Sequence, residues 1–352
     1  WPLGDIINST PTLVSGPGEQ YDLLYGNDSK YKDFRSKYQN RRRMVYVGAN
    51  DGMLHAFNAG IFNESTTSFD ANPSDDGWSA PALGDELWAF VPYDNLPHLQ
   101  WLACNGTATD PSQCGSSEYT HVFYVDARPK VTDVRIFCRN ASVDAAYSSA
   151  DYPSSCFTGQ GAASHPNGWG TIMIMSMRFG GGAIWTDLNG DGDTADAGEQ
   201  SFSSAYYAFD VTDPEKKPKL LWRFTDDALG FTTSYPAIVR MGADDETGKW
   251  YMVVGNGPKN TTDATGSNSG AIPLRDYGGK YTDVAGKVFV VDLSNATSVT
   301  TFTTGSTNEY MGDPLVVDKN FDFESDVIYI GSSINTGSTD VDGKVYRINT
   351  NG

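Results

Sequence analysis

Short apolar runs that alternate with polar residues recur along the chain and are separated by glycine-containing turns. The clearest copy is MVYVGANDGMLHAFN at 44–58. Its Asp51-Gly52 dipeptide favours a tight hairpin turn, because glycine readily adopts positive φ. Imperfect copies at 251–293 and 327–349 also place two apolar runs around a polar connection. The pattern predicts antiparallel strand pairs.

Single strands are predicted between these pairs, because further apolar runs are bounded by turn-forming residues. They are ELWAFVP from Glu86, THVFYVD from Thr120, TIMIMSMRF from Thr171 and AYYAFDVT from Ala205. Repeated antiparallel sheets suit a β-propeller, whose blades leave only short, protected edges. We therefore predict an all-β fold, a modified β-propeller, with 1–352 as a single domain.

Three stretches that are rich in turn formers interrupt the strands, at 63–78, 103–118 and 259–277. We predict that they are insertions on the rim of the propeller, because turn formers favour loops. No interior linker divides the chain. The composition agrees with this fold class. The 37 glycines, 19 tyrosines and 17 phenylalanines favour short strands joined by tight turns over helices.

The formal net charge is -19 and the pI is near 4.4. Such a surface repels a phosphate backbone, so we expect no nucleic-acid partner. Solubility accounts for most of this acidity. Carboxylates that are spaced within single loops also indicate divalent cations.

The four cysteines, Cys104, Cys114, Cys138 and Cys156, lie within one third of the chain, and none is in a C-x-x-C spacing. This makes zinc a poor fit and favours two disulfides in an exported protein. Of three pairings, Cys104 with Cys114 and Cys138 with Cys156 close the shortest loops, but the sequence leaves the pairing open.

No apolar run approaches the roughly 20 residues that span a bilayer, so no membrane span is expected. The first residue, Trp1, is not an initiator, and we therefore expect the chain to be an excised piece of a longer protein. Export is inferred from the cysteines and the acidic loops.

The segment DKNFDFESD is the strongest candidate site. It places oxygen-bearing side chains at positions 1, 3, 5 and 9, which are Asp318, Asn320, Asp322 and Asp326. Calcium takes 6 to 8 oxygen ligands, and alternate residues of a tight loop can turn toward one centre. Position 7, Glu324, would contribute its backbone carbonyl. The sequence therefore predicts a Ca²⁺ site.

This loop departs from an EF-hand in two ways. Phe323 replaces the usual glycine at position 6, and Tyr329 occupies position 12 in place of a bidentate glutamate. The loop runs directly into the strand VIYIG, so no flanking helices are expected. An ion here would pin a turn at the entrance of a strand.

A second candidate Ca²⁺ loop is DLNGDGDTADAGE, between two predicted strands. Gly192 stands at position 6, whereas the acids at positions 10 and 13 require a bulge to close the site. Magnesium is the weaker candidate for both loops, because it seldom uses all-protein oxygen cages. The proposed ligands are Asp187, Asn189, Asp191, Asp193, Asp196 and Glu199.

No catalytic motif stands out, and we expect no enzyme activity. The four histidines are scattered, and neither a G-x-S-x-G elbow nor a P-loop occurs. The run Gly180-Gly181-Gly182 lacks the following helix of a dinucleotide site and is interpreted as a tight turn. Adjacent acids such as Asp226-Asp227 are interpreted as solvated turns.

Several stretches together resemble the C-terminal domain of the PilY/PilC family, the calcium-binding tip-associated adhesins of bacterial type IV pili. They include WPLGDIINSTPTLV, RRRMVYVGANDGMLHAFNAG, GDELWAFVP, YVDARPKVTDV, GWGTIMIMSMRFGGG, LLWRFTDDALGFTTSYPAIV and DKNFDFESDVIYIG. The pieces are individually weak, but their order and the nine-residue loop make the resemblance specific.

The resemblance implies a seven-bladed propeller, exported to the cell surface or the pilus tip, that works with minor pilins. It implies roles in pilus biogenesis, in twitching motility and in adhesion to a host or abiotic surface. The family's calcium site, which influences pilus extension against retraction, falls on Asp318, Asn320, Asp322, Glu324 through its carbonyl, and Asp326.

Two other functions stay open. YVGANDGMLHAF also resembles the blade motifs of quinoprotein dehydrogenases, which share propeller architecture, so a quinoprotein-like oxidoreductase is one alternative. The chain has no adjacent cysteine pair of the kind many such enzymes carry. The other alternative is a structural module that calcium merely stabilises.

Overall fold

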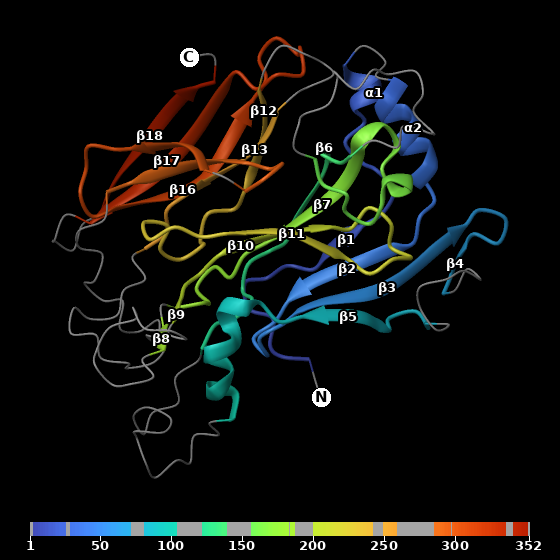
Figure 1. The fold of residues 1–352 in the computed structure, drawn as a ribbon, viewed down its shortest axis with the longest axis horizontal. Helices are drawn as coiled ribbons and strands as arrows, with labels where there is room; N and C mark the ends of the chain where they lie inside the picture. Colours follow the sequence, from blue (N-terminus) through green and yellow to red (C-terminus); the bar gives the residue numbers. More distant parts are fainter. Residues whose placement is uncertain are drawn as a thin grey trace.

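The structure is a computed structural model. It describes the chain apart from residues 1–2, 26–28, 72–80, 104–121, 139–155, 183, 187–199, 242–248, 259–284, 297, 336–340 and 351–352. The described residues are mostly β and form four antiparallel sheets of three or more strands (Figure 1). Within this part of the chain, no helix has the length and apolar character needed to cross a membrane.

The four sheets follow one another along the sequence, and each is built largely from consecutive strands. The first contains β1 (Thr12–Val14), β2 (Arg43–Gly48), β3 (Leu54–Asn63), β4 (Ser68–Asp70) and β5 (Glu86–Phe90). The second has the order β11 (Lys219–Phe224), β10 (Tyr206–Asp210), β7 (Trp169–Met175) and β6 (Lys130–Arg135). A separate pair joins β8 (Ile184–Thr186) to β9 (Gln200–Phe202).

The third and fourth sheets complete the series. The third consists of β12 (Ala237–Met241), β13 (Lys249–Gly255), β14 (Lys287–Asp292) and β15 (Ser298–Thr303). The fourth consists of β16 (Glu309–Val317), β17 (Val327–Asn335) and β18 (Val341–Asn349). The predicted pairs at 44–58, 251–293 and 327–349 are therefore confirmed as β2–β3, β13–β14 and β17–β18.

Successive sheets pack face to face, so strands of the middle sheets are buried on both sides. Every residue of β7 is buried. Ile172 and Ile174 belong to the core between the second and third sheets. Met173 and Met175 belong to the core between the first and second sheets. Because successive side chains of a strand point to opposite faces of the sheet, β7 contributes residues to both cores.

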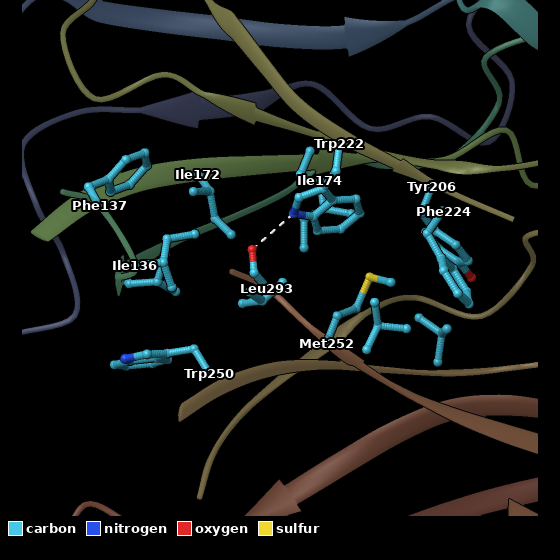
Figure 2. Packing of buried hydrophobic residues seen from close by; sticks show 14 of the residues in the cluster. Ile136, Phe137, Ile172, Ile174, Tyr206, Trp222, Phe224, Trp250, Met252 and Leu293 are labelled. Carbon is cyan, nitrogen blue, oxygen red and sulfur yellow. Dashed lines mark hydrogen bonds between the residues drawn. The ribbon is translucent and has the colours of Figure 1, made fainter. Parts of the chain in front are cut away.

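Figure 2 shows the core between the second and third sheets, which contains side chains from both. Trp222 of β11 and Met252 of β13 are buried there, and the Trp222 indole N–H donates a 3.0 Å hydrogen bond to the Leu293 carbonyl. This bond satisfies the buried indole donor and ties the second sheet to the end of β14. A third core, which includes Val253 and Ile330, joins the third sheet to the fourth.

The helices are α1 (Tyr21–Leu24), α2 (Ser29–Tyr38) and the 3₁₀ segments Tyr93–Ala103, Ala162–Ser164 and Pro166–Gly168. Helices α1 and α2 lie together at one edge of the stack, whereas the segment Tyr93–Ala103 lies apart from them and contacts β9 (Figure 1). The sequence analysis did not predict α2. Its buried aromatic residues Tyr31, Phe34 and Tyr38 follow the i, i+3, i+7 spacing of a helical stripe and join the main core.

One predicted strand is wrong. The described part of THVFYVD, 122–126, has no strand conformation, and the strand lies instead at Lys130–Arg135. Tyr124 and Val125 are nevertheless buried. The Tyr124 carbonyl lies against Gly180, and the Val125 carbonyl lies against Gly48. An added Cβ at Gly48 or Gly180 would collide with these oxygens. The apolar pattern here reflects a buried connection.

The predicted Cys138–Cys156 disulfide is present, with Cα atoms 4.9 Å apart. It stands beside a short parallel bridge between Phe137 and Phe157. Cys104 and Cys114 lie outside the described residues. So do residues 72–78, 104–118 and 259–277 of the three predicted insertions. Four successive sheets agree with stacked blades, whereas seven blades and a closed ring stay predictions.

Truncation of a doubly packed strand should be costly. Ile174 is 1% exposed, so Ile174→Ala is expected to lower the free energy of unfolding by about 2–5 kcal/mol in urea titrations. Leu220→Ala on β11 of the same sheet is the matched control, because Leu220 is 43% exposed. Equal losses from both variants would contradict the packing described above.

The disulfide should also stabilise the fold. Its two cysteines are 18 residues apart, and loops near this length contribute about 3 kcal/mol. The double variant Cys138→Ser with Cys156→Ser is expected to lose stability of that order in urea unfolding. An unchanged unfolding midpoint would show that the bond is absent in solution.

Candidate calcium-binding loop

The candidate site is the nine-residue connection between β16 and β17. These strands pair antiparallel, with Val317 opposite Val327, so the connection is a hairpin loop of the fourth sheet. The prediction that the loop enters the strand VIYIG is confirmed. The register brings positions 1 and 9, Asp318 and Asp326, to the neck of the hairpin.

The three aspartates turn their carboxylates toward the backbone of their own loop. Asp318 accepts hydrogen bonds from the Phe321 and Phe323 amides at 2.7 and 3.1 Å. Asp326 accepts one from the Lys319 amide at 2.6 Å, across the neck. Asp322 accepts one from the Glu324 amide at 2.9 Å. These bonds give the loop its turns, as aspartate side chains commonly do.

The other predicted ligands have different surroundings. The Asn320 side-chain amide donates a 2.7 Å hydrogen bond to Asp322, so these two neighbours are in contact. Glu324 is half-buried. In the described part of the chain, no three His, Cys, Asp or Glu side chains gather closely enough to hold a metal ion. The calcium ligand set therefore stays a prediction.

Phe323 adopts a backbone conformation that normally belongs to glycine. Its φ is 75°, and that of Phe321 is 59°, both in the left-handed region. In an EF-hand, position 6 requires glycine for the sharp turn. Phe323 occupies the same position with the same sign of φ. The unusual residue thus does not prevent the turn.

Aromatic contacts anchor Phe323 to the rest of the protein. Its ring stacks on Tyr25 with centroids 4.2 Å apart and an interplanar angle of 16°. The Tyr21 ring lies 4.6 Å away and the Trp250 ring 5.9 Å away. The guanidinium of Arg240 lies 4.1 Å from the Phe323 centroid. These partners come from α1, its C-terminal end, β12 and β13.

Backbone contacts fix the base of the loop. The Ser325 amide donates to the Arg240 carbonyl at 2.9 Å, and the Arg240 amide donates to the Ser325 hydroxyl at 3.2 Å. The Thr350 amide donates to the Asp326 carbonyl at 3.0 Å. The loop is thereby joined to β12 and to the end of β18. Burial, together with the adjacent charge and hydrogen bond of Asp318, raises the pKa of Tyr25.

The ligands predicted for the second calcium loop lie outside the described residues, within 187–199. The strands on either side are described. β8 and β9 pair antiparallel with Thr186 opposite Gln200, so this segment connects the two arms of a hairpin. The sequence analysis did not predict these two strands.

Two buried histidines lie close to carboxylates, and the sequence analysis missed both contacts. Both ring nitrogens of His55 face carboxylates, Glu86 at 2.6 Å and Asp51 at 3.1 Å. Burial opposes protonation, but these two carboxylates outweigh it and raise the pKa of His55. His165 lies 2.9 Å from Asp210, and both side chains are fully buried. The Asp51-x₃-His55 spacing was the readable signal, whereas the second pair had none.

The fold and the loop define a class: a mostly β protein of stacked antiparallel sheets that carries an acidic hairpin loop. The crystal structure of the Pseudomonas aeruginosa PilY1 C-terminal domain is similar to this chain, with a TM-score of 0.50 at 21% identity. The match covers 92% of this chain and 44% of that one. At this identity the likeness shows the fold alone.

The sequence comparisons are more specific. The chain is 28% identical over 266 residues to a type IV pilus biogenesis factor PilY1 homolog of Xylella fastidiosa, and 29% identical over 269 residues to type IV pilus biogenesis factor PilY1 of Pseudomonas aeruginosa. Both matches cover 74% of this chain but only 14% and 15% of the relatives. No family profile matches the chain. The predicted resemblance is thus confirmed by similarity to these relatives.

Proposed function

We propose that this chain is part of a type IV pilus biogenesis factor at the cell surface or pilus tip, and that its loop 318–326 binds Ca²⁺. Similarity to proteins named as such factors supports the pilus role. The observation that carries the calcium role is a tight hairpin loop in which three carboxylates accept hydrogen bonds from the loop's own amides and position 6 is left-handed.

The residues of the loop fit calcium by their chemistry. Asp318, Asn320, Asp322 and Asp326 would supply side-chain oxygens, and Glu324 would supply its carbonyl. The Asn320 amide would turn over, so that its oxygen rather than its nitrogen faces the ion. A bound ion would neutralise carboxylates that otherwise repel one another within one loop. It would supply charge and rigidity, and no chemical step.

The pilus role includes the finer features that the family resemblance implies. These are a closed seven-bladed ring in the longer protein, partnership with minor pilins at the fibre tip, attachment to a host or abiotic surface, and calcium control of extension against retraction. We propose no enzyme activity. The second loop, 187–199, is proposed as a further Ca²⁺ site because its sequence places oxygen-bearing side chains at alternate positions from Asp187 to Asp193.

A purely structural role for calcium is the second candidate. The loop connects β16 to β17, and the bonds that involve Ser325 and Thr350 tie it to β12 and to the end of β18, so an ion there would hold four strands in place. Ion binding to the folded state alone would then stabilise it by mass action. The regulatory and the structural role differ in what a loop variant should lose. Under regulation the variant loses pilus function but stays folded, and under the structural role it loses stability.

Calcium binding should be measurable directly. Isothermal titration is expected to show binding to the wild type, and calcium at 100 times its Kd should stabilise the fold by about 2.7 kcal/mol. Asp318→Ala with Asp322→Ala should lose the heat assigned to this loop and the stabilisation. The charge-matched control is Asp227→Ala with Asp342→Ala, two exposed aspartates outside the loop. No heat with wild type would refute the site.

The pilus role is tested in the full-length protein, in bacteria whose own copy is deleted. The Asp318→Ala and Asp322→Ala variant should fold normally and yet reduce surface piliation and twitching motility. The Asp227→Ala and Asp342→Ala control should restore both. Loss of motility with an unchanged thermal midpoint in calcium supports regulation. Unfolding of the loop variant supports the structural role instead.

A further inference from the structure

Phe323 connects the acidic loop to the N-terminal part of the chain. Its backbone belongs to the loop, since its amide donates to Asp318 and its carbonyl accepts a 3.3 Å hydrogen bond from Arg240. Its ring lies outside the loop and stacks on Tyr25, directly after α1. In Figure 1 the β16–β17 connection and α1 lie side by side at the top of the view. One residue therefore contacts both a predicted ligand and the helix.

The contact is part of a larger aromatic cluster. Tyr21 of α1 packs on Phe323 and also lies 5.6 Å from Trp169 and 6.0 Å from Trp250. These tryptophans belong to β7 and β13, so the cluster reaches the second and third sheets. Segment 21–25 thus rests on the loop on one side and on the sheet stack on the other.

The position of the Phe323 ring depends on the backbone of the loop. A residue with φ of 75° directs its side chain differently from one in the ordinary β or α regions. Moving Phe323 out of the left-handed region would therefore withdraw the ring from Tyr25. A tight ion-binding loop selects the left-handed conformation at position 6. Ion binding and ring stacking consequently favour the same backbone state.

We infer that Phe323 couples calcium occupancy of loop 318–326 to the packing of segment 21–25 against the sheet stack. This inference rests on the proposed calcium site. Binding of the ion holds the ring against Tyr25, and the docked segment in turn raises the affinity of the loop for calcium, because coupling between two sites is reciprocal. Phe323 is a positioning residue that acts through the loop backbone.

Hydrogen exchange measures the effect of calcium binding on the docking of segment 21–25. The amides of Leu23, Leu24 and Tyr25 are hydrogen-bonded to Gln20 and Tyr21, so their exchange reports whether the segment is docked. Saturating calcium should slow their exchange at least fivefold in the wild type, the low end of typical coupling. Phe323→Gly should abolish this effect and still bind calcium, because glycine accepts the left-handed conformation.

Phe321→Gly is the matched control. Phe321 also has positive φ and stands two residues earlier, but its side chain is 77% exposed. This variant should bind calcium and keep the full calcium effect on segment 21–25. Loss of the effect in both glycine variants would overturn the inference, since general loosening of the loop would then explain it.

A double-mutant cycle measures the reciprocal effect of the docked segment on calcium binding. Tyr25→Ala should weaken calcium binding at least fivefold in the wild-type background, but less than twofold in the Phe323→Gly background. Tyr25→Phe keeps the stacked ring without the hydroxyl and should preserve the coupling. Equal effects of Tyr25→Ala in both backgrounds, or loss of coupling in Tyr25→Phe, would overturn the role of ring stacking.

The two proposals fail in different ways. If wild-type protein gives no calcium heat, the calcium site itself is refuted. If wild-type protein binds calcium but the exchange of Leu23, Leu24 and Tyr25 does not change, the site stands and the coupling is refuted. Circular dichroism of every variant ensures that the comparison is made between folded proteins.

Discussion

The structure depends on the burial of both faces of its middle sheets. An antiparallel sheet commonly keeps one face in water and alternates apolar with polar residues. Here β7 and β10 are buried along their whole length, and alternate side chains enter different cores. Each middle sheet is therefore stabilised by its two neighbours, as in repeat proteins whose units contact the next in line. The fourth sheet differs, because Leu315 and Val345 are 64% and 77% exposed.

This stacking determines where an acidic loop can be placed. The faces of the middle sheets are occupied, and in the fourth sheet the acidic residues of the loop lie in the connection between β16 and β17. The register that sets Val317 opposite Val327 leaves nine residues for the turn and brings Asp318 and Asp326 together at its neck. The Lys319 amide, next to Asp318, donates a hydrogen bond across the neck to Asp326. The fold thus supplies the spacing, and the sequence supplies the oxygen atoms.

Features determined by neighbours in sequence could be predicted, and features determined by distant contacts could not. The hairpin at 44–58 follows from Asp51-Gly52, and the loop follows from alternating oxygen-bearing residues. The buried connection at 122–126 was predicted as a strand, because the residues of this segment do not indicate that the distant Gly48 packs against it. The aromatic residues of α2 have helical spacing in the sequence, but the sequence analysis considered only the strand patterns and did not predict this helix. The contact of Tyr25 with Phe323 spans almost the whole chain, and no local pattern indicates it.

A phenylalanine at position 6 needs a physical explanation, because a left-handed non-glycine residue costs about 1–3 kcal/mol. Aromatic pairs contribute about 0.5–1.5 kcal/mol each, and a partly desolvated cation–π contact contributes up to about 2 kcal/mol. The contacts of Phe323 with Tyr25, Tyr21 and Arg240 can together offset that cost. Glycine would adopt the same turn without help from elsewhere. With phenylalanine, the turn is favourable only while the aromatic partners from α1 are in place, so the shape of the loop depends on a helix at the other end of the chain.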